Sequence, residues 1–368
     1  MNKSIFIVAT VFCLAMLGCS NPINQNAAGA GNSDTTGETK YVSVTDSIGS
    51  YATWSADKTY YVNTAIRVAN GGTLVIPAGT IVKFGTEGSL SVEDGGVLSA
   101  QGSASNPIYF TSAKDSRGET VFVGTAAAGD WEGIRVELGS SGSVFSNCVF
   151  CYGGKNMYAA LRIVGSASVD SCLFRDNIGG HPTRSDVNDY ATLDARDAQS
   201  GTVITNNLFY RNLWPLAVSC GFNLSASNTF SCDEDNNAAT PVVTNTQQAI
   251  YMDYGDISSA VSWLETEVPL CTFSNLIRIT SAASLTIANG AVIKNSTSEF
   301  LVEENGVLNR AGAIFTSYRD DNHGGDTNGD GTVTSPQKGD WTGIEVFGTD
   351  GFEYSADETI LYAEQPTT

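Results

Sequence analysis

Apolar residues along most of the chain come in short alternating pairs. Leu90 with Val92 and Ile108 with Phe110 are examples, and Gly, Asn, Asp or Pro residues separate such pairs from one another. A period of two places alternate side chains on one face of a strand, where they can be buried together. The pattern therefore predicts an all-β chain in which strand and turn follow one another without helices between them.

One segment departs from this alternation. Its apolar residues follow helical spacing, and Asp256 or Ser258 could serve as the N-cap. We therefore predict one short helix, built on Ile257, Val261, Leu264 and Val268.

Two parts of the chain repeat one another, and their first matched blocks are offset by 211 residues (284 minus 73). Residues 73–83 (TLVIPAGTIVK) match residues 284–294 (SLTIANGAVIK), and three further blocks follow in the same order. These blocks pair 92–98 with 302–308, 110–112 with 315–317, and 129–134 (GDWEGI) with 339–344 (GDWTGI). Four matched blocks in one order indicate a duplicated module, at about 73–136 and 284–346.

A shorter signature recurs between the two copies, with Cys or Asn two residues before Phe. In a strand, residues two apart point to the same side, so stacked coils would form a Phe stack beside a ladder of Cys and Asn. The irregular spacing implies insertions near 180–200 and 231–270. The five occurrences are Cys148-Val-Phe150, Cys172-Leu-Phe174, Asn207-Leu-Phe209, Asn228-Thr-Phe230 and Cys271-Thr-Phe273.

These repeats resemble those of right-handed parallel β-helix proteins, the pectin-lyase-like superfamily, and especially bacterial surface lipoproteins with a Gly-Asp-Trp-x-Gly-Ile block. The resemblance covers about residues 60–360. It implies a right-handed, single-stranded parallel β-helix, a solenoid with loop insertions, over residues 42–368. The ends of a solenoid need caps, and we expect the N-terminal cap within residues 42–62. At the other end, either the tail folds over the last coil or that end meets another subunit.

The charge composition of the chain argues against one class of partner. The chain carries 19 Lys and Arg against 39 Asp and Glu, and its formal net charge is -20. Such a field repels phosphate backbones, which argues against a nucleic-acid partner.

The N-terminal residues have the features of an export signal. Lys3 precedes an apolar run over residues 5–17, which is too short to span a bilayer and fits a signal peptide. Its end, Met16-Leu-Gly-Cys19, resembles the bacterial lipobox and implies cleavage after residue 18 and lipidation of Cys19. By analogy with the sorting of the lipoproteins that it resembles, Ser20 after this cysteine implies the outer membrane. Residues 19–41 have the composition of a flexible tether. We therefore expect an exported, membrane-anchored lipoprotein on the cell surface.

Six cysteines remain after the leader and the lipobox. Adjacent-strand spacing would allow a disulfide between Cys148 and Cys172, and Cys220 with Cys232 is the next candidate pair. Cys148-x-x-Cys151 has no second CxxC beside it, so stacked core thiols or disulfides are a better interpretation than zinc.

The sharpest chemical motif is residues 326–334 (DTNGDGTVT). Asp326, Asn328 and Asp330 offer side-chain oxygens at positions 1, 3 and 5, and Thr332 offers its carbonyl, the donor set that Ca²⁺ prefers. The segment resembles the calcium loops of dockerins and thrombospondin type 3 repeats. Gln337 stands where an EF-hand has its bidentate acid, and Asp320, Asp321 or Asp340 could supply the missing carboxylate. The motif predicts a structural Ca²⁺ that orders an insertion.

Catalysis has weaker support. The superfamily contains polysaccharide lyases and glycoside hydrolases, and the best candidate groups lie in residues 176–197, but no known catalytic pattern appears there. For ligand binding, aromatic side chains in or beside the insertions could hold sugar rings: Tyr210, Trp214, Tyr251, Tyr254 and Trp263. We predict a calcium-stabilised surface protein with a non-catalytic role in adhesion, in the envelope or in carbohydrate binding. The alternative is a lyase or hydrolase acting on acidic glycans.

Overall fold

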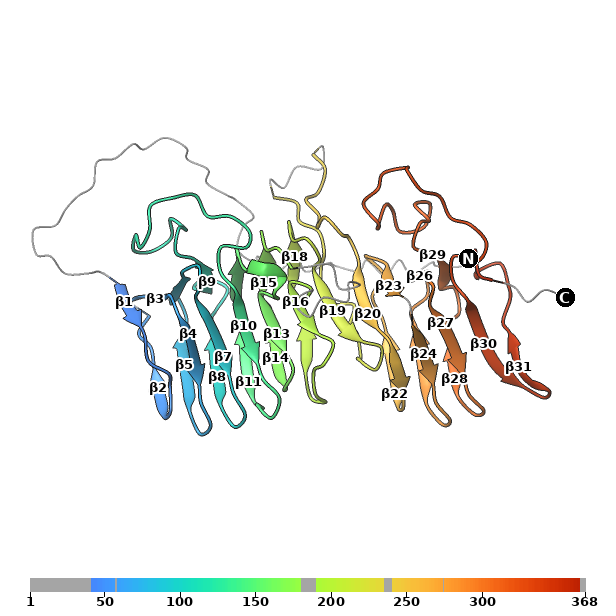
Figure 1. Ribbon diagram of the computed structural model, residues 1–368, viewed down its shortest axis with the longest axis horizontal. Coiled ribbons are helices and arrows are strands. Elements are labelled where there is room, and N and C mark those ends of the chain that lie inside the picture. The colour runs from blue at the N-terminus through green and yellow to red at the C-terminus, as the bar shows by residue number, and fades with distance from the viewer. Residues whose placement is uncertain (1–40, 57, 180–189, 235–239, 274, 365–368) are drawn as a thin grey trace, which may run out of the picture.

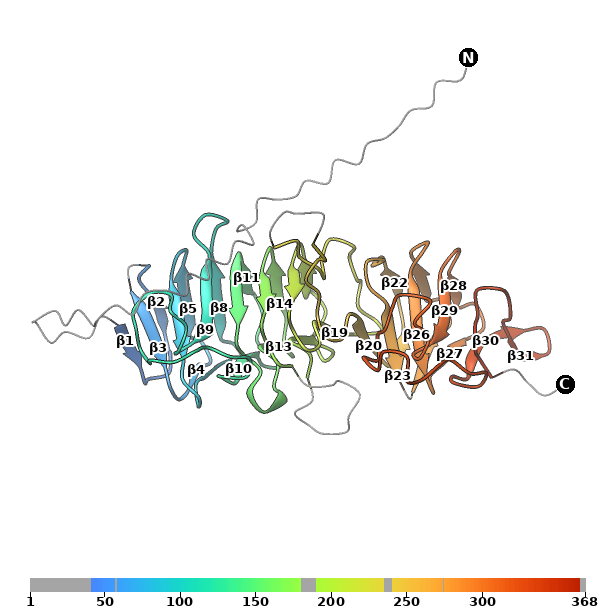
Figure 2. The same ribbon diagram turned by 90° about the horizontal axis from the view of Figure 1, so that it is seen from above.

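The protein is an elongated stack of parallel strands, and the computed structural model in Figure 1 shows it from the side with its long axis horizontal. The structure describes residues 41–56, 58–179, 190–234, 240–273 and 275–364. These residues form 31 strands and one short 3-10 helix, η1 (Lys155–Met157). Figure 2 shows the strands following one another along the long axis, from β1 and β2 at one end to β31 at the other. The fold is a parallel β-helix, as the sequence predicts.

The strands form five sheets that run along this axis. The seven-stranded sheet contains β1 (Tyr41–Val44), β3 (Thr59–Val62), β6 (Ile81–Phe84), β9 (Ile108–Ser112), β12 (Cys148–Cys151), β15 (Leu173–Arg175) and β18 (Leu208–Tyr210). The ten-stranded sheet contains β4 (Ala65–Val68), β7 (Ser89–Val92), β10 (Gly133–Val136), β13 (Leu161–Ile163), β16 (Leu193–Ala195), β19 (Leu216–Ser219), β20 (Ile250–Asp253), β23 (Leu270–Phe273), β26 (Val292–Ser296) and β29 (Ile314–Ser317).

The other three sheets complete the coils. The six-stranded sheet contains β2 (Tyr51–Thr53), β5 (Thr73–Pro77), β8 (Val97–Gln101), β11 (Ser143–Ser146), β14 (Ala167–Asp170) and β17 (Val203–Thr205). The five-stranded sheet contains β21 (Gly255–Ile257), β24 (Leu276–Ile279), β27 (Glu299–Val302), β30 (Gly343–Gly348) and β31 (Gly351–Tyr354). The three-stranded sheet contains β22 (Ala260–Trp263), β25 (Ser284–Ile287) and β28 (Val307–Asn309). Only the pairing of β30 with β31 is antiparallel among these strands.

In many strands, alternate side chains point inward and fill the core. In β5, Leu74 and Ile76 are buried, whereas their neighbours are only half-buried. At the corners the backbone passes close to the preceding coil. A Cβ on Gly88 would lie 2.2 Å from the Val62 carbonyl oxygen, so a residue without a side chain is needed there.

The predicted Phe stack and Cys/Asn ladder are both present. The rings of Phe150, Phe174, Phe209 and Phe230 stack with centroids 4.7, 4.9 and 5.2 Å apart. Beside them, the Cys148 N–H donates to the Cys172 Sγ, the Cys172 N–H to the Asn207 Oδ1, and the Asn207 N–H to the Asn228 Oδ1. The fifth signature is wrong: Cys271 and Phe273 lie in the ten-stranded sheet and pack with Trp214 and Tyr251 in a separate cluster.

A second ladder, not predicted, follows the next corner. Asn177, Asn212 and Asn245 are buried in successive coils, and each amide bonds to the next. Asp176 and Arg211, the residues directly before two of them, have left-handed backbones with φ of 56° and 54°. Such a residue bends the chain at one position. The side chain of the buried Asn that follows bonds backbone groups of the preceding coil: the Asn212 amide donates to the Phe174 carbonyl, and its oxygen accepts from the Asn177 N–H.

The two copies of the module do not use the same sheets. By sequence, β9 corresponds to β29 and β10 to β30, yet β9 lies in the seven-stranded sheet and β29 in the ten-stranded sheet. In the same way β10 lies in the ten-stranded sheet and β30 in the five-stranded sheet. The change falls where β20 stacks on β19, after the segment 220–249. Equivalent residues of the two copies therefore face different sides of the solenoid.

The predicted helix is wrong. Ile257 ends β21, and Val261 lies in β22, which pairs with β25. Val261 and Trp263 are buried on one face of β22, so the apolar spacing arises from two short strands and the corner between them.

Of the two predicted alternatives for the C-terminal end, the tail folds over the last coil. Phe315 bridges to Ile360 and Trp341 to Ala363, both in parallel orientation. Arg310 fastens this tail through Thr359 and Asp357, each at 2.8 Å.

Candidate functional site

Three carboxylates meet on the loop between β29 and β30. One oxygen each from Asp321, Asp326 and Asp330 lies within 4.8 Å of the others. Because Ca²⁺ holds oxygens at about 2.3–2.6 Å, two oxygens on one ion are at most about 5 Å apart. The Oδ1 atoms of Asp321 and Asp330 are buried without a hydrogen-bond partner among the described residues. The donor chemistry and the spacing both fit a hard cation such as Ca²⁺.

The rest of the predicted motif lies around this cluster. The Asn328 amide donates to the Asp330 Oδ2 at 2.9 Å, and the Gly331 N–H donates to the Asp326 Oδ2 at 2.8 Å. Thr332 follows on the exposed part of the loop. The hydrogen bonds curl residues 326–331 so that Asp326 and Asp330 face the same point.

Of the three candidates for the missing carboxylate, only Asp321 joins the cluster. Asp320 instead accepts a hydrogen bond from the Thr316 hydroxyl at 2.5 Å and contacts the His323 Nδ1 at 2.7 Å. Asp340 accepts from Ser317 and pairs with Arg319. Asp320 and Asp340 therefore hold the base of the loop.

The positive charge of Lys294 partly balances the negative charge of the three acids. Burial and then the charge of Asp326 raise the pKa of Asp321. Lys294, whose charge acts on Asp321, is buried and donates to the Gly325 carbonyl. Burial lowers the pKa of Lys294, although the neighbouring acids oppose this effect. A divalent cation would relieve the repulsion among the three acids.

The loop of the first copy has the same base. Lys83 is buried and donates to the carbonyls of Asp115 at 2.6 Å and Glu119 at 2.8 Å. The Thr111 hydroxyl donates to Asp115 at 2.6 Å, as Thr316 does to Asp320. In the first copy the Ser112 hydroxyl donates to Asp130. In the second copy the Ser317 hydroxyl donates to Asp340 in the same way. Our sequence reasoning missed this use of Lys83 and Lys294, although each ends a matched block.

This shared base predicts acid sensitivity. Burial opposes ionisation of Asp115, but hydrogen bonds from Thr111 and Arg117 outweigh it and lower its pKa. A depressed folded-state pKa stabilises the fold fully above about pH 4, and this stabilisation is lost as pH falls through the folded value. We expect Asp115→Asn to cost about 1–3 kcal/mol at pH 7, and the deficit to shrink toward pH 2. Thermal unfolding at pH values from 7 to 2 measures this stability deficit. Glu304→Gln, at an exposed position, is the control. A deficit that does not change with pH would contradict the lowered pKa of Asp115.

The aromatic residues proposed as sugar platforms are mostly in the core. Tyr210, Trp214, Tyr251 and Trp263 are all at most 4% exposed, so their faces are covered by protein. Tyr254, at 55%, is the only one of the five with an accessible ring.

A pocket of about 170 Å³ opens on the outer face of the ten-stranded sheet. Ser91, Arg135 and Arg162 lie in register across β7, β10 and β13. Glu132 and Tyr158 also line the pocket. The paired residues two positions earlier in β7 and β10 are Ser89 and Gly133, whose side chains are small or absent. A Cβ on Gly133 would lie 2.1 Å from the Ala159 carbonyl oxygen, so close packing of the coils requires this glycine and leaves a hollow above it.

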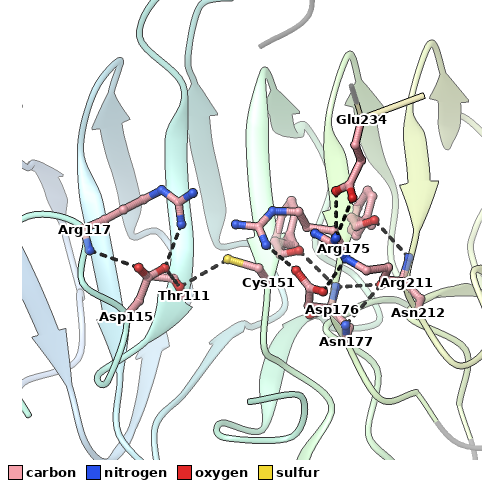
Figure 3. A network of polar contacts seen from close by, with 12 residues as sticks. Thr111, Asp115, Arg117, Cys151, Arg175, Asp176, Asn177, Arg211, Asn212 and Glu234 are labelled. Carbon is pink, nitrogen blue, oxygen red and sulfur yellow. Dashed lines mark hydrogen bonds and ion pairs between the residues drawn. The ribbon is translucent and has the colours of Figure 1, made fainter. Parts of the chain in front are cut away.

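Polar groups also cover the seven-stranded sheet (Figure 3). Arg175 pairs with Asp176, which also contacts the Arg211 Nε at 2.7 Å, and Arg211 reaches Glu234 at 2.7 Å. Asp176 thus bridges two arginines and joins successive coils. Of the other candidates in residues 176–197, Asp194 pairs with Arg196 and Asp197 with Arg162. His181, Arg184, Asp186 and Asp189 lie outside the described residues.

The predicted disulfides are not formed. Cys148, Cys172 and Cys220 are buried free thiols. Cys148 points into the core, whereas the Cys151 Sγ donates to Thr111 on the outer side of β12, because residues three apart in a strand face opposite sides. Burial raises the pKa of Cys220 and of Cys271 to about 12. These two thiols are protonated at neutral pH, and the CxxC spacing brings no thiol pair together.

The stacked parallel strands of the described residues define the fold class, a parallel β-helix. Residues 46–157 match the family model described as a pectate-lyase like beta helix domain. With the parallel sheets, this match supports the pectate-lyase-like superfamily, and the matched region contains the first module copy and most of the pocket. No curated protein and no solved structure matches the chain. In the described residues no helix is long and apolar enough to cross a membrane.

Proposed function

We propose that the protein is a calcium-stabilised β-helix on the cell surface that binds carbohydrate without cleaving it. The meeting of Asp321 with Asp326 and Asp330 carries the calcium part of this proposal. In the matched pectate-lyase like domain, the outer pocket offers hydroxyl, guanidinium and carboxylate groups to a ligand. The described acids of residues 176–197, Asp176, Asp194 and Asp197, are engaged in ion pairs, which favours a binding role over catalysis.

The lipobox-like sequence supports anchoring through Cys19, with the outer membrane as the site. A chain acylated at Cys19 would partition with membranes, since each buried methylene contributes about 0.8 kcal/mol. Fractionation of cells that express the full chain tests this part. Cys19→Ser should release the protein from the membrane fraction, and an unchanged distribution would contradict the anchor.

Calcium should raise thermal stability. A cation at about 100 times its Kd adds about 2.7 kcal/mol to a folded state that alone binds it. We expect a higher melting temperature in Ca²⁺ than in chelator, and loss of this difference in Asp321→Asn. Asp350→Asn, an exposed acid in the turn between β30 and β31, is the matched control. Equal melting temperatures in Ca²⁺ and in chelator would exclude a stabilising ion.

The binding part is tested by passing the full-length protein over immobilised polysaccharides. Retention that free polysaccharide competes away supports a carbohydrate ligand. If the protein binds no member of a broad polysaccharide panel, the result would contradict carbohydrate binding and favour an adhesive or structural role.

A further inference from the structure

The charges around the pocket on the ten-stranded sheet are already paired. Arg135 contacts Glu137 at 2.8 Å, and Arg162 contacts Asp197 at 2.6 Å. Glu132, which lines the pocket, adds a third acid. The two guanidinium groups therefore do not leave a free positive charge, and the whole chain carries -20. A polyanion would meet repulsion here, whereas an uncharged ligand would not.

Paired donors and acceptors suit hydroxyl groups. A guanidinium beside a carboxylate presents N–H donors and oxygen acceptors at neighbouring positions, and each hydroxyl of a sugar both donates and accepts. Arg135 and Arg162 supply the donors, Glu132 supplies the acceptor, and Ser91 can do both. A ligand with adjacent hydroxyls could satisfy these groups without breaking either ion pair.

The pocket is small and one wall is held rigidly. Its volume of about 170 Å³ is below the roughly 300–1,000 Å³ of sites for drug-sized ligands, so it has room for one ring rather than a chain segment. The Arg162 guanidinium stacks on Tyr190 with its carbon 4.2 Å from the ring centroid. Tyr158, which lines the pocket, stacks on the same Tyr190. Groups fixed in this way lose little entropy when a ligand binds.

We propose that this pocket binds one neutral sugar residue of a glycan through its hydroxyl groups, with Arg135 and Arg162 as donors and Glu132 as acceptor. The inference rests on the proposed carbohydrate-binding function and names its site and ligand class. The second module copy lacks the equivalent site. Glu299 and Glu345 stand there in place of Ser89 and Arg135, and burial followed by the charge of Glu345 raises the pKa of Glu299.

Calorimetric titration of the full-length protein tests the proposal. The neutral probes are oligosaccharides from galactomannan, xylan and β-glucan, and the anionic probe is oligogalacturonate. We expect at least one neutral probe to bind, with an affinity that changes little between about 50 and 200 mM salt because no net charge is exchanged. Glu132→Gln and Tyr158→Ala should each weaken binding about tenfold or more. Arg67→Ala removes an Arg–Glu pair from the same row outside the pocket and should leave binding unchanged.

The outcomes separate this inference from the proposed function. Neutral binding that survives both pocket substitutions would overturn the site while carbohydrate binding stands. Binding of oligogalacturonate alone, weakened by salt and by Arg135→Ala, would overturn the ligand class. If none of the probes binds, the carbohydrate-binding function fails and this inference fails with it. Unchanged melting temperatures of the variants confirm that they are folded.

Discussion

Replacing Asn212 with leucine is expected to lower the free energy of unfolding by about 3–5 kcal/mol. Asn212 is 1% exposed, and its amide donates to the Phe174 carbonyl and to the Asn245 Oδ1, both at 2.9 Å. Its own oxygen accepts from the Asn177 amide at 3.0 Å. Leucine keeps a similar volume but leaves these buried groups without partners, at about 1–3 kcal/mol for each group.

Urea denaturation measures this loss, and Asn309→Ala is the matched control. Asn309 is exposed on β28, and its side-chain amide donates to the Thr286 hydroxyl at the surface. Its replacement should change stability by no more than about 0.5 kcal/mol. An effect of Asn212→Leu as small as that of the control would show that the second ladder does not stabilise the coils.

The second large effect is expected at the repeated tryptophan. Trp131 is fully buried, its ring stacks on Phe84 with centroids 4.3 Å apart, and its Nε1 donates to the Cys151 carbonyl at 2.9 Å. Trp131→Ala removes a large core side chain, and we expect a cost of about 3–5 kcal/mol. Trp131→Phe retains most of the ring and should cost less.

Trp341 provides an internal comparison. It occupies the same place in the second copy and donates to the Leu361 carbonyl at 2.8 Å, but its ring lies 6.2 Å from that of Phe315, in the last coil. Because a solenoid is stabilised by contacts between neighbouring repeats, a change in the last coil should loosen mainly that end. Hydrogen exchange would show wide loss of protection in Trp131→Ala and local loss in Trp341→Ala. Equal, global effects would contradict this view.

The fold follows from the sequence because its signals are local and repeated. Period-two alternation and the recurring Cys or Asn before Phe indicate which residues share a face of a strand. Stacked coils of similar length then bring these residues into register. The same reasoning failed at Ile257 and Val261, where two short strands and a corner imitate helical spacing. It also failed at Cys271-Thr-Phe273, because the change of sheet after β19 turns this signature away from the stack.

The candidate sites were predictable only in part. The motif identifies Asp326 and Asp330, but Asp320, Asp321 and Asp340 are equal candidates until hydrogen bonds to Thr316 and Ser317 account for two of them. The pocket could not be predicted, because coil lengths and the inserted loops alone decide that Ser91, Arg135 and Arg162 stand in one row. Burial of the aromatic candidates likewise depends on how the insertions pack.

The most direct test of the central claim is to incubate the full-length protein with neutral and acidic polysaccharides in Ca²⁺ and to follow retention and new chain ends together. The account predicts retention of neutral glycan without new reducing or unsaturated ends. Release of such ends, abolished by substitutions of the acids and arginines in residues 176–197, would contradict it and identify a lyase or hydrolase.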